Sequence, residues 1–159
     1  MQYLGEVKEV SSNAISRDLQ ADIIRALPRA IKQVKPFAEK FRGANDTETA
    51  KKIWRFLRTQ IIYKRDKPNK QRIFLPSAFL HFKKADCKSY ATFTAAILCA
   101  LQIPNGYHFT SYQSTTTPSH IYNFIRLANG RHLPLDGCYS KFGIEKKPLF
   151  LRVHKNDYK

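Results

Sequence analysis

The stretch ADCKSYATFTAAILCALQIP, residues 85–104, decides how the rest of this sequence is interpreted. Asp86 is a residue type that caps the start of helices, and the apolar residues that follow it recur at helical spacing. Pro104 begins the turn sequence Pro-Asn-Gly, which ends a helix. We therefore predict a helix over residues 87–101 whose first residue is Cys87.

The predicted position of Cys87 favours a reactive thiol. The first turn of a helix has unpaired N–H groups and the positive end of the helix dipole, and both favour the thiolate over the thiol. Most free cysteines are instead small buried hydrophobic residues, and Cys99, which lies between apolar residues of the same helix, fits that description. Cys87 is followed by Lys88 and Ser89 at the polar start of the helix. We therefore expect Cys87 to be a nucleophile and Cys99 to be a core residue.

A nucleophilic cysteine needs a base, and the base needs a partner that holds its tautomer. His120 opens a predicted strand over residues 120–127, and Asp136 directly follows a predicted strand over residues 131–135. The turn sequence Ala-Asn-Gly at 128–130 predicts a hairpin, which brings His120 and Asp136 to the same end of a sheet. A single histidine in a strand is most often not catalytic, so it is the order cysteine, histidine, aspartate that favours a catalytic triad.

Helical patterns precede strand patterns along the rest of the chain. The other predicted elements are a helix from Ser16 that Pro28 kinks or splits in two and Gly43 closes, a helix capped by Asp46 or Thr47 that ends near Ile61, a loop from Lys64 to Lys84 with a short turn at Ser77–Phe82, and strands at Tyr107–Tyr112 and Leu149–Val153. Helices followed by an antiparallel sheet predict an α+β domain. No repeat and no Gly/Ser-rich linker divides the chain, so we expect a single domain over residues 1–159.

The composition limits the class of protein. The 28 lysines and arginines outnumber the 12 aspartates and glutamates, and the net charge of +16 is shared equally by residues 1–70 and 71–159. Such a charge attracts anions, which include nucleic acids, acidic proteins and membrane headgroups. Three cysteines are too few, and odd in number, for a disulfide scaffold, which favours a reducing, cytoplasmic location. No apolar run reaches the ~20 residues that cross a bilayer, and residues 1–10 lack the pattern of a signal peptide.

Several of these segments resemble the transglutaminase-like superfamily. In that superfamily an Asp-Cys pair opens a helix that ends in a Leu-x-Ile-Pro type of turn, as in residues 85–104. Ser-His-Ile-Tyr at 119–122 is similar to the superfamily's histidine strand, and Leu-Pro-Leu-Asp at 133–136 is similar to its aspartate strand. Residues 53–63 resemble the helix that ends in an aromatic residue before a linking loop. By this resemblance the chain is identified as a small bacterial or phage-type member.

The resemblance implies a papain-like transglutaminase core over about residues 46–145, with the nucleophile helix packed on an antiparallel sheet and residues 1–45 as a helical N-terminal extension. It also implies acyl transfer through a thioester. Cys87 attacks an amide carbonyl, His120 acts as general base and then acid, and Asp136 orients the histidine. The acyl group then passes to an amine in cross-linking, or to water in deamidation or proteolysis. No metal and no organic cofactor is required for this chemistry.

An acyl-transfer site also needs hydrogen-bond donors where the oxyanion develops. The backbone N–H of Cys87, at a helix start, is a natural first donor, and Gln71 is our choice for the second because relatives often carry a polar residue on this loop. Trp54 is an alternative donor, but its place in an apolar helical stripe favours core packing. Cys138 lies two residues beyond Asp136, so it could face the same pocket or be a packed or surface thiol.

As a partner we expect an acidic protein or peptide substrate, and no membrane. The competing hypothesis is a catalytically quiet basic domain of the same fold that binds nucleic acid or an acidic protein, for example as a structural protein of a phage. It ranks second because the sequence has no helix-turn-helix and no aromatic platform for RNA. The cysteine and histidine spacings also match no zinc site.

Overall fold

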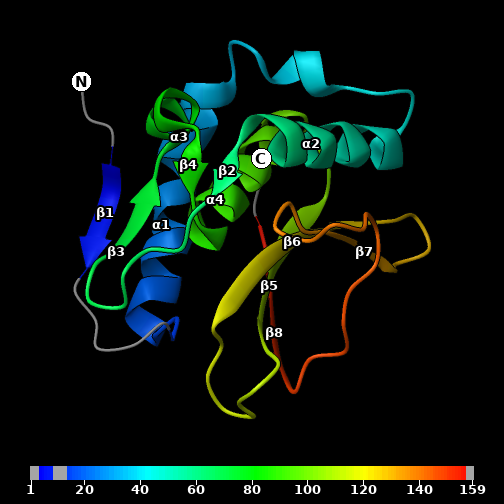
Figure 1. Cartoon of the computed structure of the whole chain (residues 1–159). Coiled ribbons are helices and arrows are strands. Elements are labelled where there is room, and N and C mark those ends of the chain that lie inside the picture. Colours follow the sequence, from blue (N-terminus) through cyan, green and yellow to red (C-terminus); the bar gives the residue numbers. More distant parts are fainter. Residues whose placement is uncertain (1–3, 9–13, 157–159) are drawn as a thin grey trace.

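A computed structural model describes residues 4–8 and 14–156 (Figure 1). Helices dominate up to residue 100 and strands follow, which confirms the predicted α+β class. The elements, in chain order, are β1 (Leu4–Lys8), α1 (Arg17–Val34), the 3-10 helix η1 (Ala38–Phe41), α2 (Asp46–Gln60), β2 (Ile62–Tyr63), β3 (Gln71–Phe74), α3 (Pro76–Phe82), β4 (Lys84–Ala85), α4 (Cys87–Ala100), β5 (Asn105–Ser111), β6 (His120–Arg126), β7 (His132–Leu135) and β8 (Phe150–Lys155). None of the helices in this described part of the chain is long and apolar enough to span a bilayer.

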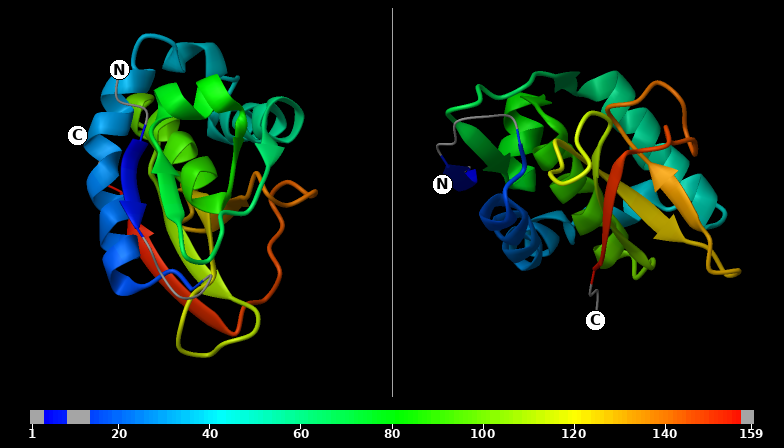
Figure 2. Two further views of the ribbon diagram at one scale, coloured as in Figure 1. Left: turned by 60° about the vertical axis from the view of Figure 1, so that its left-hand side comes forward. Right: turned by 90° about the horizontal axis from the view of Figure 1, so that it is seen from below.

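The predicted nucleophile helix, α4, is the central helix of the fold. It is buried on every side from Cys87 to Cys99, which is typical of a helix that is apolar around its whole circumference. It packs against α1 and against β5 and β6 of the main sheet (Figure 2). The Asp86 side chain caps it by accepting a hydrogen bond from the backbone N–H of Lys88. The predicted helix and its cap are therefore confirmed, and Cys87 occupies the first helical position.

The main sheet is antiparallel and has the strand order β7-β6-β5-β8. β6 and β7 form the predicted hairpin, in which Arg126 pairs with His132. Gly130 in the turn has a φ of 84°, a left-handed conformation that glycine adopts without strain. β5 lies between β6 and β8 and is buried along its whole length. The hairpin places the start of β6 near the end of β7, at one end of the sheet.

The N-terminal third differs from the prediction in two respects. α1 continues through Pro28 instead of splitting into two helices, although a proline removes one backbone hydrogen bond. The buried face of α1 packs against α4, so tertiary burial outweighs the local penalty of the proline. The expected helical extension over residues 1–45 contains a strand, β1, before α1. Residues 1–3 and 9–13 of that extension lie outside the described residues.

The segment before α4 is also more regular than predicted. The expected loop over residues 64–84 contains β3, which pairs with β1, and α3, where the sequence predicts only a turn. The N-cap of α2 is Asn45 rather than Asp46 or Thr47, because the Asn45 side chain accepts a hydrogen bond from the backbone N–H of Glu48. The difference in residues 64–84 is relevant to the pocket described below, since β3 and the loop before it form part of the pocket wall.

Candidate active site

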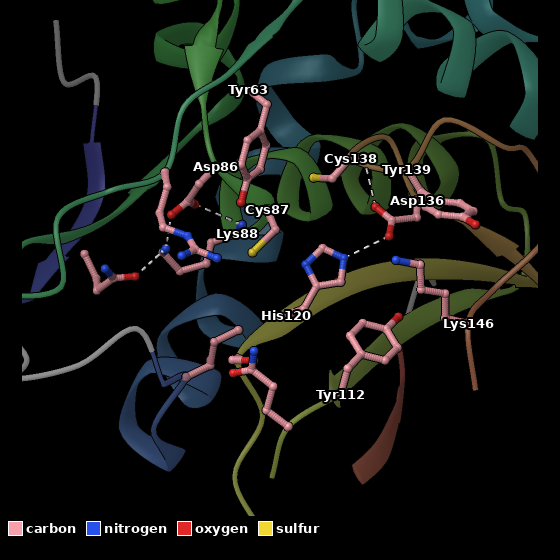
Figure 3. Close-up of a pocket in the computed structure, with 15 residues that line it drawn as sticks. Tyr63, Asp86, Cys87, Lys88, Tyr112, His120, Asp136, Cys138, Tyr139 and Lys146 are labelled. Atoms are coloured by element: carbon pink, nitrogen blue, oxygen red, sulfur yellow. Dashed lines mark hydrogen bonds and ion pairs between the residues drawn. The ribbon is translucent and has the colours of Figure 1, made fainter. Parts of the chain in front are cut away.

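Cys87, His120 and Asp136 come together in one pocket (Figure 3). Cys87 begins α4, His120 begins β6, and Asp136 directly follows β7. β6 contacts α4 and pairs with β7, so the start of the helix, the start of β6 and the end of β7 converge. The three residues, which are far apart in the sequence, are therefore close together in space.

His120 lies between the other two residues. Its Nε2 is 2.8 Å from Asp136 Oδ2, and its other ring nitrogen faces the Cys87 thiol (Figure 3). Burial lowers the pKa of His120, but the hydrogen bonds with Asp136 and Cys87 outweigh this effect and raise the pKa to about 10. The charged imidazolium is therefore the favoured form of His120 at neutral pH, directly beside the thiol.

The pocket around these residues has a volume of about 360 Å³. Its wall contains three tyrosines and two cations that the sequence did not single out, namely Tyr63, Tyr112, Tyr139, Arg65 and Lys146. Over the described ranges 4–8 and 14–156, no group of three or more histidines, cysteines and carboxylates is arranged to hold a metal ion. The wall therefore presents aromatic rings and positive charges to a ligand in the pocket.

Tyr63 is a functional candidate that the sequence interpretation missed. β2 pairs in parallel with β4, and Tyr63 lies opposite Ala85, two residues before Cys87. The Tyr63 hydroxyl points toward Cys87 (Figure 3). Burial and a negative charge on Cys87 raise the pKa of Tyr63, so the phenol stays protonated and can donate a hydrogen bond. The aromatic end of the segment 53–63 is the sequence signal that could have found it.

Gln71 lines the pocket, but its amide is engaged elsewhere. Its Oε1 accepts a hydrogen bond from Lys88 Nζ at 2.5 Å, and its Nε2 donates to the backbone oxygen of Lys67 at 2.9 Å. Gln71 is also the first residue of β3 rather than a loop residue. These contacts do not fit the predicted role of Gln71 as an oxyanion donor, and Tyr63 faces Cys87 instead.

Lys88 forms ion pairs that stabilise the part of the pocket wall next to Cys87. Only 2% of Lys88 is exposed, and its ammonium forms ion pairs with Asp86 and, at 3.9 Å, with Asp66 Oδ2. Asp66 in turn binds the Arg72 guanidinium at 2.8 Å. Two cations thus neutralise two buried carboxylates, and together they join the segment before β3 to the start of α4.

Lys88→Met is expected to destabilise the fold by about 3–5 kcal/mol, because it leaves Asp66 and Asp86 buried without their shared ammonium. Urea unfolding followed by circular dichroism measures the change. The matched control is Lys84→Met, which removes an exposed lysine of β4 and should change stability by less than about 0.5 kcal/mol. Equal stability of the two variants would contradict this role of Lys88.

The model of the transglutaminase-like domain family matches residues 32–136 of the chain. The chain belongs to this family. The match contains the segments that carry Cys87, His120 and Asp136. A search among curated proteins finds no significant match.

Two solved structures share the fold of this transglutaminase-like domain. A candidate cysteine protease from Cytophaga hutchinsonii aligns with a TM-score of 0.54 at 18% identity, over 82% of this chain and 48% of that chain. A candidate protease from Parabacteroides distasonis aligns with a TM-score of 0.58 at 13% identity, over 84% of this chain and 29% of that chain. These alignments show a common fold, and the domain spans less than half the length of either protein.

The structure of this transglutaminase-like domain also places the other three residues that the sequence analysis discussed, Cys99, Cys138 and Trp54. Cys99 is buried in the core, as predicted. Cys138 lines the pocket, its backbone N–H donates to Asp136 Oδ1 at 2.9 Å, and burial together with the charge of that carboxylate raises the pKa of the Cys138 thiol. Trp54 packs against the core, as predicted, and its Nε1 donates to the backbone oxygen of Tyr139. Of the two thiols that line the pocket, Cys87 is the one that faces the histidine that bonds Asp136.

Proposed function

We propose that this chain is a cysteine enzyme that hydrolyses or transfers the acyl group of protein or peptide amides. In this proposal Cys87 is the nucleophile, His120 the general base and acid, and Asp136 the group that orients the histidine. The transglutaminase-like family and the shared fold support a cysteine enzyme. The observation that carries the proposal is the position of His120, which is hydrogen-bonded to Asp136 and faces a cysteine at the start of a buried helix.

In the first step His120 takes the proton of the Cys87 thiol, and the raised pKa of His120 favours the imidazolium that results. The Cys87 sulfur attacks the amide carbonyl and forms an S–C bond. His120 gives its proton to the leaving nitrogen, the C–N bond breaks, and a thioester remains on Cys87. The neutral His120 then takes a proton from water or from an amine, whose oxygen or nitrogen attacks the thioester and displaces the sulfur.

The negative oxygen that forms in each step needs hydrogen-bond donors. The backbone N–H of Cys87 suits the first position, because the first N–H groups of a helix have no partner within the helix. The Tyr63 hydroxyl suits the second, since it points toward Cys87 and stays protonated. Tyr63 therefore takes the role that the sequence assigned to Gln71.

Labelling with a thiol reagent tests this proposal without a known substrate. At pH 7 we expect Cys87 to react with iodoacetamide at least about 10-fold faster than Cys99 or Cys138, because only a thiolate reacts readily. Peptide mass spectrometry after timed labelling measures the three rates in one sample. If Cys87 reacts no faster than the other two thiols, the proposed nucleophile is wrong.

A further inference from the structure

Two positive charges in the pocket wall have no carboxylate partner. Arg65 follows β2 and lies close enough to Tyr63 to influence its ionisation. Lys146 lies on the far side of His120 from Cys87 (Figure 3), with its Nζ over the rings of two wall tyrosines at 5.9 and 5.6 Å. Neither residue forms an ion pair with any part of the chain that the structure describes. We call Arg65 and Lys146 the pocket cations.

The carboxylates of the same wall are already neutralised. Asp86 is paired with Lys88, and Asp136 is paired with His120. The pocket cations therefore give the wall a net positive charge even when Cys87 is a thiolate, and the net charge of +16 on the chain adds to the same field. Both pocket cations are exposed side chains, so they can reach a ligand at the mouth of the pocket.

We infer that the pocket cations select an acyl donor with carboxylates next to the reacting amide, and that the thioester is hydrolysed rather than passed to lysine side chains. This inference rests on the proposed function, since it concerns the same thioester. An acidic peptide is attracted by the pocket cations, whereas the ammonium of a lysine is repelled by them. Water carries no charge and is not repelled. Its oxygen bonds the acyl carbon, its proton passes to His120, and the S–C bond breaks to give a carboxylic acid and the Cys87 thiolate.

The first test compares two alkylating reagents that differ by one charge. In both iodoacetate and iodoacetamide a thiolate sulfur attacks the carbon and displaces iodide, but only iodoacetate is an anion. At low ionic strength we expect the iodoacetate-to-iodoacetamide rate ratio at Cys87 to exceed the ratio for the free thiol β-mercaptoethanol by roughly 5- to 20-fold. In about 0.5 M sodium chloride most of this preference should be lost, because salt screens exposed charges over a few ångströms.

Charge-matched variants connect this preference to the pocket cations. The double variant Arg65→Gln/Lys146→Gln should bring the ratio close to that of the free thiol. The double variant Lys141→Gln/Lys147→Gln removes the same charge from exposed residues outside the pocket wall and should keep the native ratio. Equal ratios in the two variants would overturn the inference and leave the proposed function standing. A Cys87 that reacts with neither reagent faster than the other thiols would overturn both.

The second test follows the acyl group itself. A glutamine peptide flanked by glutamates and the same peptide flanked by lysines are each incubated with and without excess cadaverine, a diamine that resembles a lysine side chain. Mass spectrometry distinguishes cleavage, deamidation and an amine adduct. We expect the acidic peptide to be converted roughly 10-fold faster and to give hydrolysis products in both conditions. A cadaverine adduct as the main product of the unaltered protein would overturn the inference.

Discussion

Asp136→Asn is expected to slow amide hydrolysis about 10³- to 10⁴-fold while the protein stays folded. Asparagine cannot stabilise the His120 imidazolium, and it favours the wrong histidine tautomer. The backbone N–H of Cys138, which donates to Asp136 Oδ1 at 2.9 Å, can donate equally to an asparagine oxygen, so the local structure should persist. The release of ammonia and of new amines from dimethylated casein measures the rate.

The same substitution should leave a signature in the pH profile. His120 must be protonated to give a proton to the leaving nitrogen, and its pKa of about 10 places the alkaline loss of activity near pH 10. Without the Asp136 carboxylate the pKa of His120 falls, so the variant should lose its remaining activity at lower pH. Asp18→Asn, an exposed carboxylate in the first turn of α1, is the control with native rate and profile. A native rate and profile in Asp136→Asn would show that the carboxylate does not act through His120.

Tyr63→Phe is expected to lower kcat for amide hydrolysis about 10²- to 10³-fold, with KM nearly unchanged, because the loss is confined to a donor that contacts the oxyanion. The phenylalanine ring can keep the edge-on contact with Tyr90, whose ring centroid lies 5.9 Å from that of Tyr63. The stability of the fold should therefore change little. Steady-state kinetics on the acidic glutamine peptide separates kcat from KM.

Alkylation of Cys87 distinguishes an oxyanion donor from a residue that acts on the thiol. Iodoacetamide reacts by displacement of iodide without forming an oxyanion, so the alkylation rate should stay native in Tyr63→Phe. Tyr112→Phe removes a hydroxyl from the Lys146 side of the same pocket (Figure 3) and should change kcat by less than about threefold. If Tyr63→Phe slows alkylation as strongly as hydrolysis, the oxyanion role is wrong.

The sequence alone was sufficient to predict the helix that begins at Cys87 and the meeting of His120 with Asp136. Asp86 caps α4 through a hydrogen bond to a residue two positions away, and Gly130 supplies the left-handed conformation of the hairpin turn. The hairpin then brings the residues that begin β6 and follow β7, His120 and Asp136, to the same end of the sheet. Each of these features depends on residues that are close in the sequence, so a local pattern can reveal it.

Tertiary structure alone decided which polar side chain faces Cys87. Tyr63 reaches Cys87 because two-residue strands pair it with Ala85, and strands that short have no periodicity to recognise. Gln71 is hydrogen-bonded to Lys88, a buried ammonium that also forms ion pairs with Asp66 and Asp86. The sequence therefore determined the positions of Cys87, His120 and Asp136, whereas the position of Tyr63 beside Cys87 and the set of charges in the pocket wall depend on contacts between residues far apart in the chain. No local sequence pattern can reveal such contacts.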